Sequence, residues 1–308
     1  MFEKISLSGQ MFDQMTVWDH LEAAAAAGYT GIELRSTHAK PETDSAELDA
    51  IKAACEKKGL HIIALSCFVG NFGLLDDAGC QTAYEVFQKY TALAERMGAD
   101  MIRLWPAWQE SATASPQVWE RAVAWCQKCS DHAALYGKRV AMEMHHGTLC
   151  DTLDSCKRLI HAIDRENAGF ILDAVNIYQV PALEAMSYIY ELREKIFNVH
   201  VKDIIRLPSG NYPYCFPYAF YAQHIGRFTK VIPPDVSRVE YYAHRRINQG
   251  GVDWSGILKA LADIGYQGYL SVESVNEGNR LIPEGAALAL ACYEDLQGLI
   301  KAGVKEEA

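Results

Sequence analysis

The chain alternates short apolar runs with helical patterns over almost its whole length, and this alternation constrains the fold more than any other feature. Several helical stretches stop at a glycine, such as Gly28, Gly59 or Gly98, and a new apolar run follows within a few residues. Apolar runs between helices predict parallel strands that are covered on both faces. Eight such units fit, so we predict an α/β fold, one (β/α)8 barrel domain over residues 1–308. An open doubly wound sheet is disfavoured, because no Gly-x-Gly-x-x-Gly motif follows the first strand.

One segment interrupts the alternation. After the seventh predicted strand, residues 204–252 form a connection much longer than the usual few residues. It contains closely spaced Tyr and Phe residues over 212–221 and a basic stretch over 244–246. Loops of this length in compact domains are usually functional. We therefore predict an aromatic-rich insertion that covers a site as a lid, or that mediates a homo-oligomer or hetero-oligomer.

Charge and hydropathy narrow the class of partner. The formal net charge is -10 and the pI is about 5.5, whereas nucleic-acid binders need a basic surface. No apolar run of membrane-spanning length and no signal-peptide pattern occur. The 9 cysteines are scattered, and Cys126 and Cys129 lie in a helical pattern without a second pair, which indicates free thiols rather than a zinc site. These features predict a cytoplasmic protein with no nucleic-acid or membrane partner.

Metal-ligand side chains recur near the ends of the predicted fifth to eighth strands. These residues are Glu143, Asp173, His200 and Glu273. Functional groups of a (β/α)8 barrel lie at the carboxyl ends of its strands, and a buried carboxylate is costly unless it is paired or binds a metal. Three carboxylates and one imidazole suit one divalent ion, with Mn²⁺ most favoured and Mg²⁺, Co²⁺ or Zn²⁺ as alternatives.

Longer motifs carry a resemblance that covers nearly the whole chain. They are Glu143-Met-His145, Leu172-Asp173, His200-Val-Lys-Asp203, Gly250-Gly-Val-Asp-Trp254 and the run from Gly265 to Glu273. Together they resemble the xylose-isomerase-like TIM barrels, which include tagatose/psicose 3-epimerases and inosose dehydratases. The resemblance implies that the four ligand-type residues bind one divalent ion.

The same resemblance suggests substrate-binding residues. The 3-epimerases have an Arg six residues after the metal-binding His, and Arg206 occupies that position. Where they have a substrate-binding His, this chain has Asn176, and where they have a second Glu it has Leu149. Those two departures argue against a simple ketohexose 3-epimerase. Trp105 and Phe68, at the ends of two predicted strands, are expected either to pack against the apolar face of the sugar or to belong to the core.

The implied activity is that of a metal-dependent enzyme acting on a keto sugar or cyclitol. A base would remove the proton next to the carbonyl to give an enediolate. Return of the proton gives isomerisation or epimerisation. Loss of a neighbouring substituent gives a lyase, as in the dehydratase branch, which the His-Val-Lys-Asp motif resembles, or in C-glycoside deglycosidase catalytic subunits, which the aromatic insertion resembles. Two other classes stay open, an endonuclease-IV-like DNA repair enzyme, which the acidic charge disfavours, and a metal-free structural subunit.

The four catalytic candidates are His145, Glu143, Glu273 and Lys202. His145 follows Glu143 by two positions, so on a strand it shares the same face and lies nearer the barrel mouth. An imidazole suits general-base work near neutral pH, although His145 could instead orient Glu143. Glu273 is the second candidate base. Lys202 either polarises an oxyanion or acts as an acid, or else it forms a salt bridge with Glu33 or another barrel carboxylate.

Overall fold

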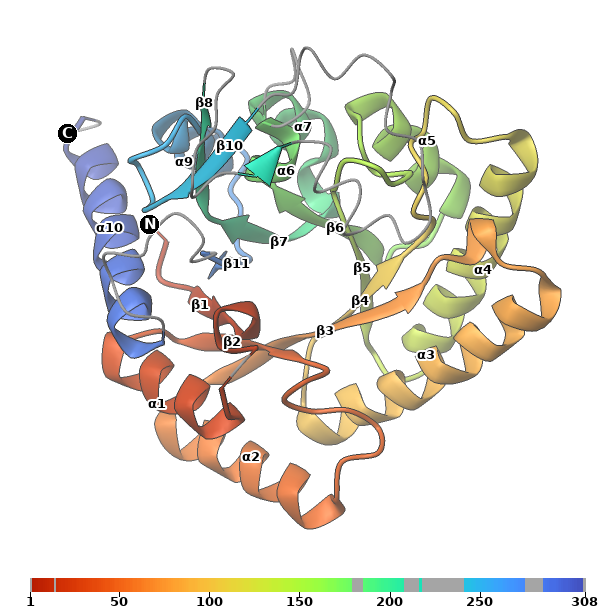
Figure 1. The fold of residues 1–308 in the computed structure, drawn as a ribbon, viewed down its shortest axis with the longest axis horizontal. Helices are drawn as coiled ribbons and strands as arrows, with labels where there is room; N and C mark the ends of the chain where they lie inside the picture. The colour runs from red at the N-terminus through yellow and green to blue at the C-terminus, as the bar shows by residue number, and fades with distance from the viewer. Residues whose placement is uncertain are drawn as a thin grey trace.

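A closed barrel of parallel strands forms the centre of the computed structural model (Figure 1), which confirms the predicted (β/α)8 fold. The structure describes the chain except for residues 1, 14, 179–184, 208–215, 218–240, 275–284 and 307–308. Neighbouring strands follow the order β1-β11-β7-β6-β5-β4-β3-β2. The barrel strands are β1 (Ile5–Ser8), β2 (Gly31–Arg35), β3 (His61–Gly70), β4 (Met101–Trp105), β5 (Arg139–Glu143), β6 (Ala168–Asp173), β7 (Ile196–Val201) and β11 (Tyr269–Val272).

Helices surround the barrel (Figure 1), and their boundaries follow from local capping chemistry. Thr16 caps the first helix in a reciprocal capping box with Asp19, and Gly28 ends it at φ 94°. Gly59 and Gly98 end the next two long helices in the same left-handed backbone region, as predicted. The α-helices are α1 (Val17–Ala27), α2 (Ser45–Lys58), α3 (Asp77–Met97), α4 (Pro116–Ala134), α5 (Leu153–Ile163), α6 (Ala174–Tyr178), α7 (Ala185–Leu192), α9 (Trp254–Asp263) and α10 (Ala286–Glu306).

The described part of the barrel also contains three short 3-10 helices, and two of its elements are longer than the sequence pattern indicates. The 3-10 helices are η1 (Gly9–Phe12), η2 (Phe72–Leu74) and η3 (Arg193–Lys195). Residues 81–97 have a helical pattern in the sequence, but α3 begins earlier, because the Asp76 carboxylate accepts the Gly79 amide as its N-terminal cap. Residues 61–67 have the pattern of a strand, and β3 extends beyond them to Gly70.

The barrel interior is layered along its axis. A small apolar cluster inside the barrel includes Ala141 and Ile171, which lie two residues before Glu143 and Asp173 on their strands. Because side chains alternate across a strand, these pairs point the same way. The apolar cluster therefore forms a floor beneath the polar groups at the carboxyl ends, while the outward faces of the strands pack under the helices.

The first and last strands close the barrel. Ile5 pairs with Leu270 and Ser6 pairs with Ser271, in parallel register. The Ser8 hydroxyl at the end of β1 donates to Glu273 Oε1 over 3.3 Å. One of the four ligand-type residues is thus oriented by the amino-terminal strand.

The predicted insertion contains a small antiparallel sheet in its described parts. This sheet comprises β8 (Asp203–Leu207), β10 (Tyr241–Arg245) and β9 (Phe216–Pro217), in that order. The Asp203 carboxylate accepts the backbone amides of Ile204, Gly250 and Val252, so it holds both ends of the insertion together. Most of the aromatic run lies outside the described residues. The roles of residues 204–252 as lid or oligomer contact, and the single-domain division, stay predictions.

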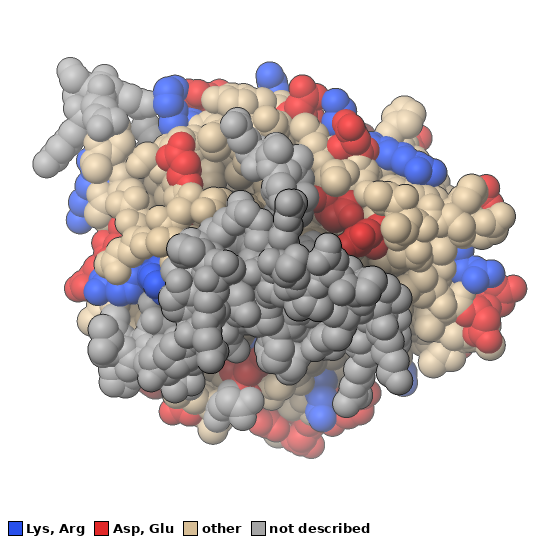
Figure 2. All heavy atoms as spheres, turned by 45° about the horizontal axis from the view of Figure 1, so that its top comes forward, with Lys and Arg blue, Asp and Glu red and all other residues tan. Residues whose placement is uncertain are grey.

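Figure 2 shows Lys and Arg side chains interspersed with Asp and Glu over the described part of one face. Among the helices that the structure describes, none combines the length and the apolar character needed to cross a membrane.

Candidate metal centre and active site

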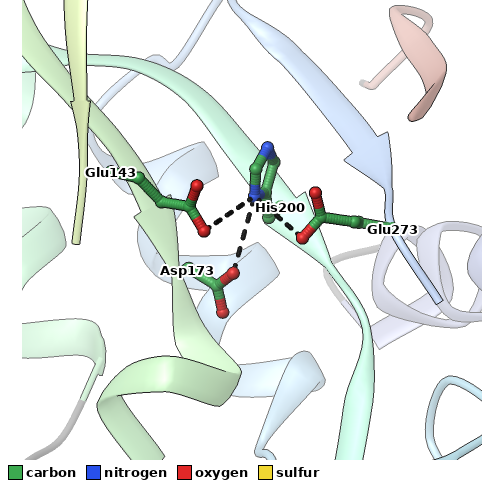
Figure 3. A group of neighbouring side chains, drawn as sticks. All are labelled: Glu143, Asp173, His200 and Glu273. Atoms are coloured by element: carbon green, nitrogen blue, oxygen red, sulfur yellow. Dashed lines mark ion pairs between the residues drawn. The ribbon is translucent and has the colours of Figure 1, made fainter. Parts of the chain in front are cut away.

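Four side chains from neighbouring strands meet at the carboxyl end of the barrel (Figure 3). Glu143 and Asp173 are the last residues of β5 and β6, His200 lies in β7, and Glu273 follows β11 directly. None is more than 4% exposed. One ligand atom from each lies within 4.8 Å of the others. The structure therefore brings together the four residues that the sequence predicted as metal ligands.

The imidazole of His200 is at the centre of this cluster. Its Nδ1 atom lies 3.3 Å from Glu273 Oε2, 3.5 Å from Asp173 Oδ2 and 3.7 Å from Glu143 Oε1. Around a six-coordinate ion with bonds of about 2.1 Å, adjacent ligand atoms lie roughly 3 Å apart and opposite ones roughly 4.2 Å apart. The spacing in the cluster is close to these values, so the four side chains fit one divalent ion.

Electrostatics favour the charged forms of His200 and Glu273. Burial lowers the pKa of His200, but the Glu273 and Glu33 carboxylates outweigh burial and hold this pKa well above its ordinary value. Burial raises the pKa of Glu273, yet His200 and Lys202 hold it well below the ordinary value. Several buried carboxylates in one place favour a cation among them, whether a proton on His200, the Lys202 ammonium or a metal ion.

Lys202 is part of the cluster itself. Its Nζ atom lies 2.7 Å from Asp173 Oδ2 and 2.8 Å from Glu273 Oε2. The alternative that Lys202 forms a salt bridge with a barrel carboxylate is therefore seen, although these partners are not Glu33. The ammonium group thus lies between two of the four ligand-type residues. Its catalytic role stays a prediction.

Arg103 is a member of the site that sequence analysis missed. It lies on β4, is 2% exposed, and its Nη1 donates to Glu143 Oε2 over 2.6 Å. Burial opposes the charge of Arg103, but Glu143 raises its pKa. The sequence did contain a signal, because Arg103 is the one charged residue in the otherwise apolar strand 101–105.

Asn176 lies against the ligands. Its backbone amide donates to Asp173 Oδ1 over 2.9 Å, and its side-chain Nδ2 donates to Glu143 Oε1 over 3.3 Å. Nδ2 also donates to the carbonyl of Met144. Asn176 thus orients two of the predicted ligands, and its predicted contact with substrate stays untested.

His145 lies beyond the end of β5, which stops at Glu143. Strand alternation therefore does not carry through to it, contrary to the geometric premise of the prediction. His145 is buried beside the Trp105 and Trp108 rings, with centroid separations of 5.8 and 5.5 Å. Its Nδ1 lies 2.6 Å from the His146 carbonyl oxygen, so a neutral His145 donates from Nδ1 and carries its lone pair on Nε2. Burial lowers its pKa, which keeps the imidazole in this basic form.

The two predicted aromatic residues differ in exposure. Phe68 is 60% exposed and lies next to the guanidinium groups of Arg35 and Arg103, at 5.2 and 4.9 Å from its ring centroid. Trp105 is 2% exposed and stacks between Phe68 and Trp108. Phe68 therefore presents an accessible ring at the carboxyl end of β3, whereas Trp105 packs behind it.

Two further predictions have different outcomes. The side chain of Arg206 lies outside the described part of the structure, so its substrate role stays a prediction. Cys126 and Cys129 are buried free thiols. Within the described ranges, one group of potential metal ligands is found, and it contains no cysteine. Its members are Glu143, Asp173, His200 and Glu273.

Comparison with known proteins agrees with this architecture. The family model described as "Xylose isomerase-like TIM barrel" matches residues 21–295, and the chain belongs to this family. It is 25% identical over 294 residues to a 3-dehydroshikimate dehydratase of Pseudomonas aeruginosa, covering 92% of the chain but 39% of that relative. It is 28% identical over 222 residues to one of Bacillus anthracis, covering 70% and 75%. It is 24% identical over 260 residues to an inosose isomerase of Bacillus subtilis, covering 82% of each.

Solved structures show the same fold at low sequence identity. The probable 3-DHS dehydratase AsbF of Bacillus anthracis has a TM-score of 0.75 at 21% identity, covering 96% of this chain and 98% of that one. The IOLI protein with a bound zinc atom has a TM-score of 0.74 at 18% identity, covering 97% and 98%. An L-ribulose 3-epimerase has a TM-score of 0.74 at 17% identity, covering 100% and 97%. Related proteins are thus enzymes named as dehydratases, isomerases and epimerases.

Proposed function

We propose that this protein is a metal-dependent enzyme that removes a proton next to the carbonyl of a small polyhydroxylated ketone, such as a keto sugar or cyclitol. The observation that carries the proposal is the position of His200 Nδ1, 3.3–3.7 Å from one oxygen of each of three buried carboxylates. Such a set fits one divalent ion, with Mn²⁺ first because carboxylates dominate it. A divalent ion held there would polarise the substrate carbonyl as a Lewis acid.

The chain's own residues would then move the proton. His145 carries its lone pair on Nε2 when neutral, so it can accept a proton from carbon, with Glu273 as the alternative base. The Lys202 ammonium beside Asp173 and Glu273 can donate to, or stabilise, the oxygen that gains negative charge. Phe68 offers an exposed ring for the apolar face of the substrate.

Return of the proton to carbon would complete an isomerisation or epimerisation, which is our first candidate reaction. A second candidate is dehydration, in which the same proton abstraction is followed by loss of a neighbouring hydroxyl group as water, after protonation by the enzyme. The names of the Pseudomonas and Bacillus anthracis relatives favour this second candidate. Both reactions share the first step, and that step is what we propose.

The test begins with metal-stripped protein. Binding of Mn²⁺, Mg²⁺, Co²⁺ and Zn²⁺ is measured by titration calorimetry, and we expect one ion per chain. Each loaded form is then incubated in D₂O with an inosose, with 3-dehydroshikimate and with L-ribulose, and both deuterium uptake and product formation are followed by NMR. Activity that depends on the added metal is expected with at least one of these compounds.

Two matched variants distinguish the loss of a metal ligand from the loss of any buried or paired carboxylate. Asp173→Asn should abolish metal binding and turnover, because it removes one ligand charge from the centre of the cluster. Asp295→Asn removes a carboxylate on α10 that pairs with Arg246, away from the cluster, and should leave both unchanged. Normal metal binding and turnover in Asp173→Asn would contradict the proposed site.

A further inference from the structure

A further buried carboxylate lies behind the proposed metal ligands, three of which are themselves carboxylates. Glu33 on β2 is 0% exposed, yet it is not one of the four residues whose ligand atoms converge. Its Oε1 atom lies 3.3 Å from His200 Nε2, on the opposite side of the imidazole from the three carboxylates around Nδ1. Each ring nitrogen of His200 thus has its own acidic surroundings.

Glu33 is held in place by donors from two other strands. Asn198 Nδ2 on β7 donates to Glu33 Oε1 over 2.7 Å, and the Ser66 hydroxyl on β3 donates to Oε2 over 2.5 Å. The Asn198 amide is oriented in turn, because Ser271 on β11 donates to its Oδ1 over 3.0 Å. Three strands therefore fix a carboxylate at the one edge of the His200 ring that faces away from the cluster.

This arrangement has a defined chemical consequence. A buried carboxylate is costly, and a residue needed only for packing at this depth would be apolar, as in the floor formed by Ile63, Met101 and Ile171. A histidine that binds a metal through one nitrogen commonly donates its other N–H to a carboxylate, which fixes the tautomer and the ring plane. Glu33 Oε1 lies beside Nε2, so a proton on Nε2 would face this carboxylate and leave the Nδ1 lone pair on the side of the three ligand-type carboxylates.

We propose that Glu33 is a positioning residue that sets His200 as an Nδ1 ligand and tunes the affinity of the site for a divalent ion. The inference rests on the proposed metal site and adds to it the group that orients the nitrogen ligand among the four described ligand-type residues. Glu33 acts through His200 and does not contact the ion. Asn198 and Ser66 support Glu33 in this role.

The decisive variant is Glu33→Gln, compared with wild type in metal-stripped form. A glutamine keeps the size of the side chain and can still accept from Asn198 and His200 through its carbonyl, but it lacks the charge. Co²⁺ is the probe, because calorimetry gives its affinity and its visible absorption reports the geometry around it. We expect Co²⁺ affinity to fall ten- to a hundredfold and the absorption bands to shift.

Ser66→Ala is the matched control. It removes one hydrogen bond to Glu33 but leaves the contact between Glu33 and His200, so Co²⁺ affinity should fall less than in Glu33→Gln. Thermal unfolding is measured for each protein with and without metal. A purely structural role of Glu33 would lower the unfolding temperature equally in both states, whereas a role in metal binding would lower it more in the metal-loaded state. Wild-type Co²⁺ affinity and an unchanged spectrum in Glu33→Gln would overturn the inference.

A second measurement does not depend on the variant folding. In wild type loaded with Zn²⁺, long-range ¹⁵N–¹H NMR of the His200 ring should show a proton on Nε2 and none on Nδ1. A proton on Nδ1 would overturn the assignment of Glu33 while leaving a metal site in place. Failure of wild type to bind any divalent ion would instead refute the proposed function, and the inference with it.

Discussion

The buried pair formed by Arg103 and Glu143 allows a quantitative test of the electrostatics of the site. Arg103→Met keeps most of the side-chain volume but removes the charge that lies 2.6 Å from Glu143 Oε2. Arg103 is 2% exposed and Glu143 is 4% exposed, so water cannot replace the lost partner. Removal of one member of a buried ion pair typically costs about 3–5 kcal/mol, because the other charge stays buried and uncompensated. We expect a loss of this size in metal-stripped protein.

The assay is urea unfolding followed by far-ultraviolet circular dichroism in the presence of a chelator. Glu143→Gln in the Arg103→Met background removes the stranded charge, so the double variant should be more stable than the sum of the single effects predicts, by roughly 2 kcal/mol or more. Arg96→Met provides a matched control, because its pair with Asp49 is exposed and should contribute no more than about 1 kcal/mol. Additive effects in the double variant would refute the argument that Arg103 serves to neutralise Glu143.

Three further predictions use other parts of the structure. Burial lowers the pKa of His20 to about 3. Below about pH 6.5 the unfolded chain therefore binds a proton that the folded chain excludes. The free energy of unfolding should fall by up to about 1.4 kcal/mol for each pH unit, down to about pH 3. His20→Gln should remove this part of the pH dependence in urea unfolding between pH 7 and 5, and an identical slope in both proteins would contradict it. His145→Ala should retain metal in calorimetry but lose at least about a hundredfold in turnover, whereas normal turnover would assign the base elsewhere. Gly250→Ala should destabilise the fold by about 1–3 kcal/mol in the same unfolding assay, because the added methyl group would overlap the Asp203 carboxylate; unchanged stability would show that this junction can shift.

The barrel and the ligand set could be predicted because both leave local traces in the sequence. Thr16 and Gly28 mark the ends of a helix by capping chemistry that depends on neighbouring residues alone. Asp173 is a charge at the end of an apolar run, which is the pattern of a barrel strand that ends at the functional face. These signals need no knowledge of which residues meet in space.

Partnerships across the barrel could not be predicted in the same way. Arg103 was visible as an isolated charge, but only the pairing of β4 with β5 places it next to Glu143. Glu33 was expected to be a possible partner of Lys202, whereas the structure pairs it with His200 and Asn198. The hydrogen-bond partner of a buried side chain depends on how strands far apart in the sequence are placed side by side, which periodicity does not encode.

The closure of the barrel between β1 and β11 has a consequence for how the protein is made. Residues 6 and 271 pair directly, so the ring cannot close until residue 271 has left the ribosome. Contacts of such large sequence separation are costly in loop entropy and form slowly. The nascent chain therefore carries the first three of the four ligand-type residues, through His200, well before Glu273 is synthesised and Ser8 can orient it. During this interval the growing polypeptide has an incomplete, strongly acidic half-site, and acquisition of the metal is expected to follow synthesis rather than accompany it.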